Sequence, residues 1–227
     1  MTHPLASIAP NGILRAAINT GNRALVQTEG DRLTGVSPAL AHRLADRIGA
    51  TLEPIIYSGA GKVFADAESG NWSVAFLAID ATRARNVSFT RPYHTIEATF
   101  AARADAPFRD TGDADRPGVT ILTSTGSAYD MHLSANLQAA TLEHSGTPGE
   151  SFDEFKSGRA DLVAGVRASL ERHFGGDPGF RILPGVLTKV EQAMVLPGPA
   201  NPLISALDDF VAEAIEDGFV ARALVGG

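Results

Sequence analysis

Residues 36–57 read VSPALAHRLADRIGATLEPIIY, and this stretch decides the fold class. In its first half, apolar residues recur at every fourth position, which predicts a helix with one apolar face. Ser37 as the N-cap and Pro38 at the first helical position favour the start of this helix, and Gly49 favours its end. The last seven residues are rich in Thr, Ile and Tyr and predict a strand, so a helix is followed directly by a strand.

The same alternation continues in both directions and favours an α/β sheet that is covered by helices on both faces. Strands are predicted at 14–18, 51–57, 74–79, 95–103, 119–123, 141–143, 161–165, 181–183 and 189–196. Helices are predicted at 37–48, 62–67, 126–137, 149–156, 167–173 and 202–217. Residues 105–118 are rich in Asp, Pro and Gly, which predicts a loop at a boundary between two lobes.

Composition excludes several classes of protein and site. The net charge of −7, without a cluster of Lys and Arg, argues against binding to nucleic acid. The chain has no cysteine, which excludes disulfides, thiolate nucleophiles and cysteine-based zinc sites. No apolar run approaches the roughly 18 residues of a membrane-spanning helix, and no basic and then apolar signal segment precedes Thr2-His3-Pro4.

Five motifs follow one another along the chain: GILR at 12–15, LTGV at 33–36 with LAHRLADRIG at 40–49, TR at 82–83 with VSFTRPY at 87–93, SGRAD at 157–161, and DGF at 217–219. Their order and spacing resemble the extracellular solute-binding protein family 3, which serves polar amino-acid ABC transporters. The resemblance implies a type II periplasmic-binding-protein fold, in which each lobe is a mixed sheet flanked by helices and two crossing hinge strands join the lobes. It implies that residues 1–100 and 190–227 form lobe one, that residues 101–189 form lobe two, and that the ligand lies in the cleft between them.

Arg83 is the first candidate ligand-binding residue. In the family, the arginine six residues before the signature phenylalanine, here Phe89, holds the carboxylate of the ligand, so the resemblance implies this role for Arg83. A planar guanidinium suits a carboxylate because it offers two parallel donors. The alternative is a surface arginine that follows a strand.

Ala78 and Asp80 end a predicted buried strand, where α/β proteins bind ligands. The resemblance implies that backbone N–H groups at Ala78 help to hold the carboxylate. Asp80 departs from the small hydroxyl residues that the family has there. Three roles remain open for it: it pairs with an amino group of the ligand, it orients Arg83, or it caps the next turn.

Gly126-Ser127-Ala128 stands where the family has Gly-Ser/Thr-Thr and opens a predicted helix of lobe two. The free N–H groups at a helix N-terminus attract anions, so this turn is a second candidate group for the carboxylate. The alternative is that Ser127 is an ordinary N-cap. Tyr129 either borders the cleft or packs inside the lobe.

Asn19 and Asn22 follow the first strand and either hydrogen-bond a polar ligand or form an ordinary turn. Glu97 interrupts an apolar strand and faces either the cleft near the hinge or solvent.

Val166 stands where family members that bind α-amino acids have an Asp, so the usual partner of the amino group is missing. Either Asp80 replaces it or the ligand lacks an α-amino group. In the second case the neighbouring Arg167 is free to receive a second carboxylate.

The resemblance then implies a function. We expect the solute-binding component of an ABC importer, a monomer in the periplasm after removal of a signal peptide, that closes on a small carboxylate-bearing metabolite, amino-acid-like or an organic acid. The expected partners are the permease subunits in the membrane; neither a nucleic acid, a cofactor nor a metal is expected. We expect no catalysis, since the chain lacks the G-x-S-x-G, H-E-x-x-H and G-x-G-x-x-G motifs. The alternatives are a ligand-sensing domain of a signalling receptor and a dehydratase on the same fold.

Overall fold

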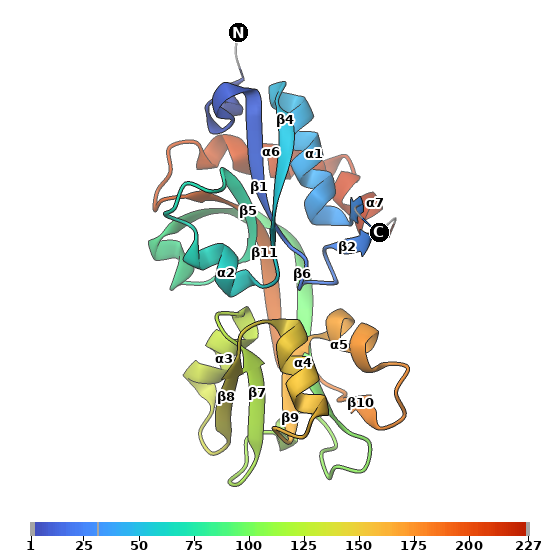
Figure 1. Ribbon diagram of the computed structural model, residues 1–227. Helices are drawn as coiled ribbons and strands as arrows, with labels where there is room; N and C mark the ends of the chain where they lie inside the picture. The colour runs from blue at the N-terminus through green and yellow to red at the C-terminus, as the bar shows by residue number, and fades with distance from the viewer. Residues whose placement is uncertain (1–2, 31, 226–227) are drawn as a thin grey trace. The chain divides into compact units, whose positions relative to one another are not determined.

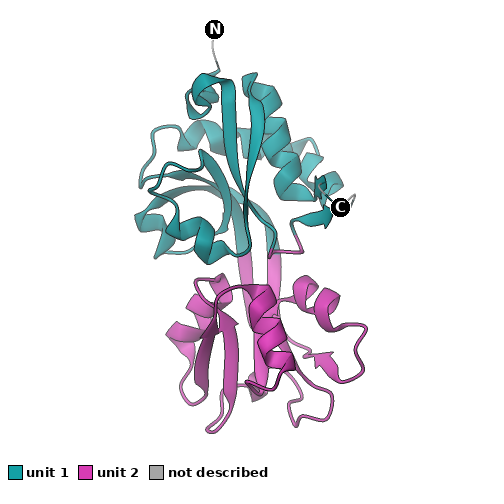
Figure 2. Cartoon of the chain, in the orientation of Figure 1, with its two compact units in different colours: residues 1–20, 25–95, 191–227 teal, residues 21–24, 96–190 magenta. Residues whose placement is uncertain are grey.

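The computed structural model describes residues 3–30 and 32–225 and has the mixed α/β architecture that the sequence predicts (Figure 1). Contacts between residues divide the chain into two compact units (Figure 2). Unit 1 comprises Met1–Thr20, Leu25–Thr95 and Glu191–Gly227, and unit 2 comprises Gly21–Ala24 and Ile96–Val190. Two long strands, β6 (Val87–Arg103) and β11 (Thr188–Pro197), contribute residues to both units.

Unit 1 contains a mixed sheet with the strand order β4-β1-β5-β11-β6. Its centre is β1 (Ile13–Asn19), which pairs in parallel with β4 (Thr51–Tyr57) on one side and with β5 (Val74–Ala78) on the other. The connection from β1 to β4 thus runs to one side of β1, and the connection from β4 to β5 returns to the other side. In α/β sheets, ligands bind at the carboxyl ends of the strands beside such a switch point.

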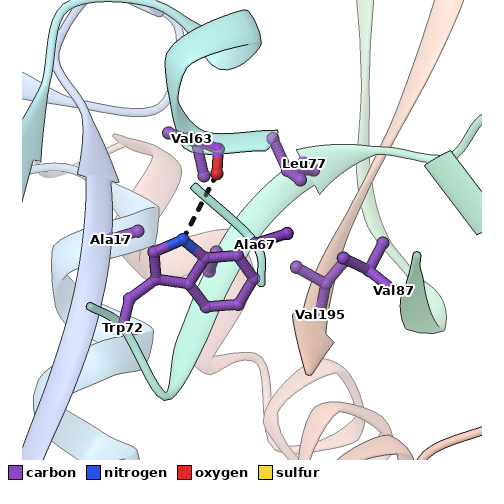
Figure 3. Packing of buried hydrophobic residues seen from close by; sticks show 8 residues of the cluster. Ala17, Val63, Ala67, Trp72, Leu77, Val87 and Val195 are labelled. Atoms are coloured by element: carbon purple, nitrogen blue, oxygen red, sulfur yellow. Dashed lines mark hydrogen bonds between the residues drawn. The ribbon is translucent and has the colours of Figure 1, made fainter. Parts of the chain in front are cut away.

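Helices cover both faces of the sheet of unit 1. α2 (Ala60–Ala65) packs on β1, β4 and β5, and α1 (Val36–Ile48) packs on β1 and β4. Because side chains alternate along a strand, β1 serves both helices. On the α2 face, Trp72 donates from Nε1 to the carbonyl of Val63 at 3.2 Å (Figure 3). The cluster around it consists of buried residues, namely Ala17, Val63, Ala67, Trp72, Ala75, Leu77, Val87 and Val195.

The start of α1 differs from the prediction. Its N-cap is Gly35, so Ser37 lies inside the first turn, where it is buried and its Oγ is 3.2 Å from Oη of Tyr93. The reason is steric: Gly35 has φ +99°, and a Cβ there would lie 2.5 Å from the carbonyl oxygen of Leu25. The predicted end is confirmed, since Gly49 is the left-handed C-cap.

Unit 2 repeats the strand arrangement of unit 1. Its central strand is β7 (Thr120–Ser124), which pairs in parallel with β8 (Thr141–Ser145) and β9 (Leu162–Val166). The unit's part of β6 pairs antiparallel with β9 and with β10 (Phe180–Ile182). The carboxyl end of β7 is therefore a second switch point.

Three helices complete unit 2, and an aromatic-rich core lies under two of them. The helices are α3 (Ala128–Asn136), α4 (Pro148–Lys156) and α5 (Arg167–Phe174). Phe155 and Phe174 meet edge to face with their ring centroids 5.8 Å apart. The buried cluster comprises Ala101, Leu122, Phe152, Phe155, Ala160, Val163, Leu170 and Phe174.

The loop at 105–118 lies inside unit 2, so its predicted place at a lobe boundary is wrong. The chain changes unit between residues 95 and 96, within the continuous strand β6, where composition gives no signal. The helix predicted at 202–217 is confirmed as α6 (Ile204–Glu216). The sequence did not predict the hairpin of β2 (Gln27–Glu29) and β3 (Arg32–Thr34) or the last helix, α7 (Phe219–Val225). Within the described residues, no helix is both long and apolar enough to span a bilayer.

Candidate ligand-binding site

Arg83 lies at the switch point of unit 1, in a short 3₁₀ helix (Arg83–Arg85) after β5. Its side chain is 1% exposed, and Nη1 donates to the carbonyl oxygen of Ala78 at 3.0 Å. Burial lowers the pKa of the guanidinium to about 10, while the negative charge of Asp80 acts in the opposite direction. Because this pKa is still far above neutrality, unit 1 buries a positive charge beside the ends of its parallel strands.

Asp80 caps the turn that carries Arg83. Its Oδ1 accepts hydrogen bonds from the backbone N–H groups of Thr82 at 2.7 Å and Arg83 at 3.1 Å. Capping is one of the three roles that the sequence left open, and the charge of Asp80 also favours the cationic form of Arg83. Its pairing with an amino group of a ligand remains a prediction.

Ala78 ends β5, and its carbonyl is the acceptor for Arg83. The next backbone N–H, that of Ile79, donates to the carbonyl of Glu191 at 2.9 Å, so the sheet already uses it. Opposite Ala78 on β11 stands Gln192, which is 4% exposed. A buried amide beside the carbonyl that holds Arg83 adds a polar group that the sequence did not predict.

Asn19 ends β1 and stands opposite Tyr57, the last residue of β4. The backbone N–H and the hydroxyl of Thr20 both donate to the carbonyl of Tyr57, at 2.8 and 3.1 Å. The phenol of Tyr57 donates to the Asp66 carboxylate, and burial together with this bond raises its pKa. Polar side chains therefore stand at the carboxyl ends of all three parallel strands of unit 1.

At the switch point of unit 2, a carboxylate of the chain itself meets the N-terminus of α3. Ser127 is the N-cap, and its Oγ accepts from the backbone N–H of Asp130 at 3.0 Å. Oδ2 of Asp130 accepts from the N–H of Gly126 at 2.8 Å, and Oδ1 lies 2.9 Å from Nε2 of His144. Asp130 is 7% exposed. A ligand carboxylate would therefore compete with Asp130 for Gly126.

The remaining residues of this turn face the interior of unit 2 to different degrees. Ala128, the first residue of α3, is half-buried. Tyr129 is 4% exposed, and its phenol oxygen lies 3.3 Å from Oγ of Ser124. Of the two alternatives, Tyr129 therefore packs inside the lobe.

Arg167 opens α5, and Glu97 lies on β6; the two form an ion pair in which Nε and Oε2 are 3.3 Å apart. Nη2 of Arg167 also donates to the carbonyl of Gly185 at 2.6 Å. Glu97 therefore faces a cation rather than only solvent. Arg167 already holds one carboxylate of the protein, which weakens the expectation that it receives a second one from a ligand.

Asn22 lies in the segment Gly21–Ala24, which belongs to unit 2 by its contacts. Ser169 of α5 holds this segment: its Oγ accepts from the N–H of Arg23 at 3.2 Å and donates to the carbonyl of Gly21 at 3.4 Å. Asn19 and Asn22 are thus brought into different units, although both were predicted to follow the first strand.

Two buried polar residues of the site, Asp130 and Gln192, were missed. The sequence carried a signal for the first, because Ser127-x-x-Asp130 has the spacing of a capping box, which places a carboxylate at a helix N-terminus. Gln192 follows Glu191 and precedes the apolar residues 193–197 of β11, and this context does not predict its burial. Among the described residues, no group of three or more His, Asp or Glu side chains could hold a metal ion.

Comparison with protein families gives one match over most of the chain. The model of the bacterial extracellular solute-binding proteins, family 3, matches residues 14–224. A curated relative, the cyclohexadienyl dehydratase of Pseudomonas aeruginosa, is 27% identical over 164 residues. The match covers 70% of this chain and 61% of that relative, so it spans less than two thirds of the dehydratase.

Solved structures of amino-acid-binding proteins share the fold. A mutant of ArgBP from T. maritima is 20% identical, has a TM-score of 0.82, and is covered over 97% of each chain. An amino acid ABC transporter substrate-binding protein from Streptococcus pneumoniae, bound to L-arginine, is 18% identical with a TM-score of 0.82, over 98% of this chain and 96% of that one. At these identities the likeness establishes the fold alone.

Proposed function

Because the chain belongs to the bacterial extracellular solute-binding proteins, family 3, we propose that it is the solute-binding component of an ABC importer and that Arg83 holds a small carboxylate-bearing metabolite. The match over residues 14–224 supports a binding role for the whole chain. The carboxylate is proposed from the chemistry of the residues at the switch point of unit 1.

The observation that carries the proposal is the burial of Arg83. Removing a cation from water is unfavourable unless opposite charge and hydrogen bonds replace the water. Burial lowers the pKa of Arg83 although the charge of Asp80 acts against it, so the folded unit disfavours the cationic form. A ligand carboxylate would stabilise the cation, and the fork of the guanidinium would orient the carboxylate.

The rest of the site favours a ligand with further polar groups. Asn19, Tyr57 and Gln192 supply amide and phenol groups near the strand ends, and such groups hydrogen-bond hydroxyl, amide or amino groups. Val166 stands where family members that bind α-amino acids have an aspartate. We therefore propose an organic acid or a modified amino acid as the ligand.

In this proposal the protein works in the periplasm and delivers its ligand to permease subunits in the membrane. The ligand binds to unit 1, and the two units then close over it, as the family resemblance implies. Small-angle X-ray scattering before and after addition of the ligand tests this step. A radius of gyration that does not fall when the ligand saturates the protein contradicts closure.

The ligand can be identified without a prior guess. Native mass spectrometry of the purified protein gives the mass of any metabolite that is retained, and a thermal-shift screen of organic acids and amino acids ranks the candidates. Binding raises the melting temperature with the logarithm of ligand concentration over Kd. Arg83→Met keeps the volume and removes the charge, while Arg85→Met alters an exposed arginine in the same 3₁₀ helix. Stabilisation only by proteinogenic amino acids contradicts the proposed ligand class, and unchanged binding by Arg83→Met contradicts the role of Arg83.

A second candidate, a dehydratase, is favoured by one specific observation, the match to the cyclohexadienyl dehydratase of P. aeruginosa. A cyclohexadienyl carboxylic acid would present its carboxylate to the same arginine. Incubation of the protein with such an acid, followed by proton NMR, separates the two functions. Stable binding without new signals supports transport. If the acid loses water in the presence of the protein, and the Arg83→Met variant abolishes this reaction, the chain is an enzyme.

A further inference from the structure

A groove of about 680 Å³ lies within unit 1 and shares no residue with the site around Arg83. It is formed by the β2–β3 hairpin, the first turns of α1, the middle of β4, and α7; Figure 1 shows α1, α7 and the hairpin on one side of the unit. Its volume is within the range of sites for small molecules. The lining residues are Arg32, Leu33, Thr34, Gly35, Pro38, Ala39, His42, Pro54, Phe219, Arg222 and Ala223.

The ionisable residues of this lining are all basic. They are Arg32, His42 and Arg222, and no acidic side chain belongs to the part of the lining that the structure describes. The whole chain has the opposite balance, with 26 acidic against 19 basic residues. Nη1 of Arg222 donates to the backbone carbonyl of Asp217 at 2.9 Å, while the carboxylate of Asp217 pairs with Arg43 at 2.6 Å. The groove is therefore a basic region on an acidic protein and attracts anions.

The other lining residues are mainly apolar, and the walls are held in place. Phe219 has the guanidinium of Arg43 over its ring, 4.7 Å from the centroid, and its N–H donates to Oδ1 of Asp217 at 2.8 Å. On the opposite side, Gly35 lies so close to the backbone of Leu25 that even a Cβ would clash. A groove with fixed walls needs little reorganisation on binding.

We propose that this groove is a second ligand site, which takes an organic monocarboxylate with an apolar body. The apolar body lies between Pro38 and Phe219, and the carboxylate faces Arg32 and Arg222. This site does not depend on Arg83 or on the ligand of the importer.

The test uses 4-phenylbutyrate and 4-phenylbutan-1-ol, two probes that share a phenylalkyl body and differ in the head group, which is an anionic carboxylate in one and a neutral hydroxymethyl group in the other. Each is titrated into ¹⁵N-labelled protein, and chemical shifts of the backbone are followed. We expect saturable shifts at the lining residues and an affinity about tenfold higher for the acid, the value of one charge-assisted hydrogen bond. Arg32→Ala should remove this preference, while Arg85→Ala and Arg83→Met should keep it.

Four outcomes of the titration of the wild type overturn the proposal. They are equal affinity for the acid and the alcohol, shifts that centre on Arg83, shifts that do not saturate, and groove shifts that follow protein concentration and so report a second copy of the chain. Ala39→Phe fills the groove and should abolish binding with an unchanged melting temperature. Retained binding by this variant also contradicts the site.

Discussion

Units 1 and 2 have the same arrangement of parallel strands but bury opposite charges beside them. Each has a central strand, β1 or β7, between two parallel neighbours. Arg83 follows β5 in unit 1, and Asp130 lies in the helix after β7 in unit 2. These two are the buried side chains with a formal charge at neutral pH in the described part of the chain.

The two charges differ in how far their own unit compensates them. Asp130 accepts the N–H of Gly126, sits at the positive end of α3, and has His144 beside it. Arg83 has a lowered pKa because desolvation outweighs the charge of Asp80. Burial thus disfavours the charged form of Arg83, whereas Asp130 lies among groups that favour its charge. This difference supports the proposed anion-binding role of Arg83 and indicates a structural role for Asp130.

The largest expected effect is on ligand binding by Arg83 variants. Arg83→Met should weaken binding of the co-purified ligand by about 2–4 kcal/mol, because it removes the main partner of a buried anion. Isothermal titration calorimetry measures the change. Arg85→Met, at an exposed arginine two residues further along the same 3₁₀ helix, should bind like the wild type. Equal losses in the two variants would mean that the general positive charge of this turn, and not the buried guanidinium, attracts the ligand.

The same substitution should have the opposite effect on the unliganded protein. The pKa of Arg83 in the folded state, about 10, lies below its ordinary unfolded value, so the folded state binds fewer protons than the unfolded state between the two values. The cost is therefore fully present below pH 10, and the free energy of unfolding should rise as the pH rises above 10. At pH 7, Arg83→Met should raise this free energy by about 1–3 kcal/mol.

Urea unfolding of ligand-free protein measures this gain. A loss of stability in Arg83→Met comparable to its loss of binding would assign Arg83 a structural role and remove the contrast between the two units.

Asp130→Ala should destabilise unit 2 by about 1–2 kcal/mol, since it removes a carboxylate from a helix N-terminus and leaves the Gly126 N–H without it. Asp153→Ala is the matched control, because Asp153 is an exposed aspartate on α4 of the same unit. Thermal unfolding compares the two variants. Ligand binding should not weaken in Asp130→Ala; a tenfold loss would show that Asp130 binds a cationic group of the ligand.

The sequence predicted the helices and strands of both units better than it predicted the surroundings of the two buried charged residues, Arg83 and Asp130. The sequence patterns gave both ends of β4 and the C-cap of α1 correctly, because these features depend on local backbone preferences. The motif placed Arg83 after β5, but its burial depends on the folded unit and leaves no mark in the local sequence. The pairing of Arg167 with Glu97 joins residues 70 positions apart, and no local pattern predicts such a pair.

Acid should weaken unit 1 before unit 2. Most carboxyl groups with a lowered pKa belong to unit 1, and hydrogen bonds are the main cause: Asp66 with Tyr57, Asp208 with Arg91, Glu213 with Arg47, and Asp217 with Arg43. In unit 2 the corresponding group is Asp115, which accepts from the N–H groups of Ala140, Ala139 and Gln138. Lowered carboxyl pKa values give stability that is present above about pH 4 and is lost as the pH falls through the folded values.

Trp72 separates the two units in this experiment, because the chain's one tryptophan is buried in the core of unit 1. Urea unfolding at pH 5 and pH 3 should shift the midpoint of its fluorescence further than the midpoint of the circular dichroism of the whole chain. Asp115→Asn should leave the fluorescence shift unchanged. Coincident shifts of both signals would contradict the unequal acid sensitivity of the units.

The smallest expected effect concerns the ion pair of Arg167 and Glu97. Its side chains are 28% and 42% exposed, so Glu97→Gln should change the free energy of unfolding by at most about 1 kcal/mol. Arg172→Met is the control: it removes an exposed arginine on α5, the helix of Arg167, and should leave the free energy of unfolding unchanged. Binding is the sharper measurement, because Glu97→Gln leaves the charge of Arg167 without its carboxylate partner. If unit 2 has no anion-binding role, the preference for a dicarboxylate over the matching monocarboxylate stays the same; a selective gain for the dicarboxylate would give unit 2 an anion site that Glu97 normally closes.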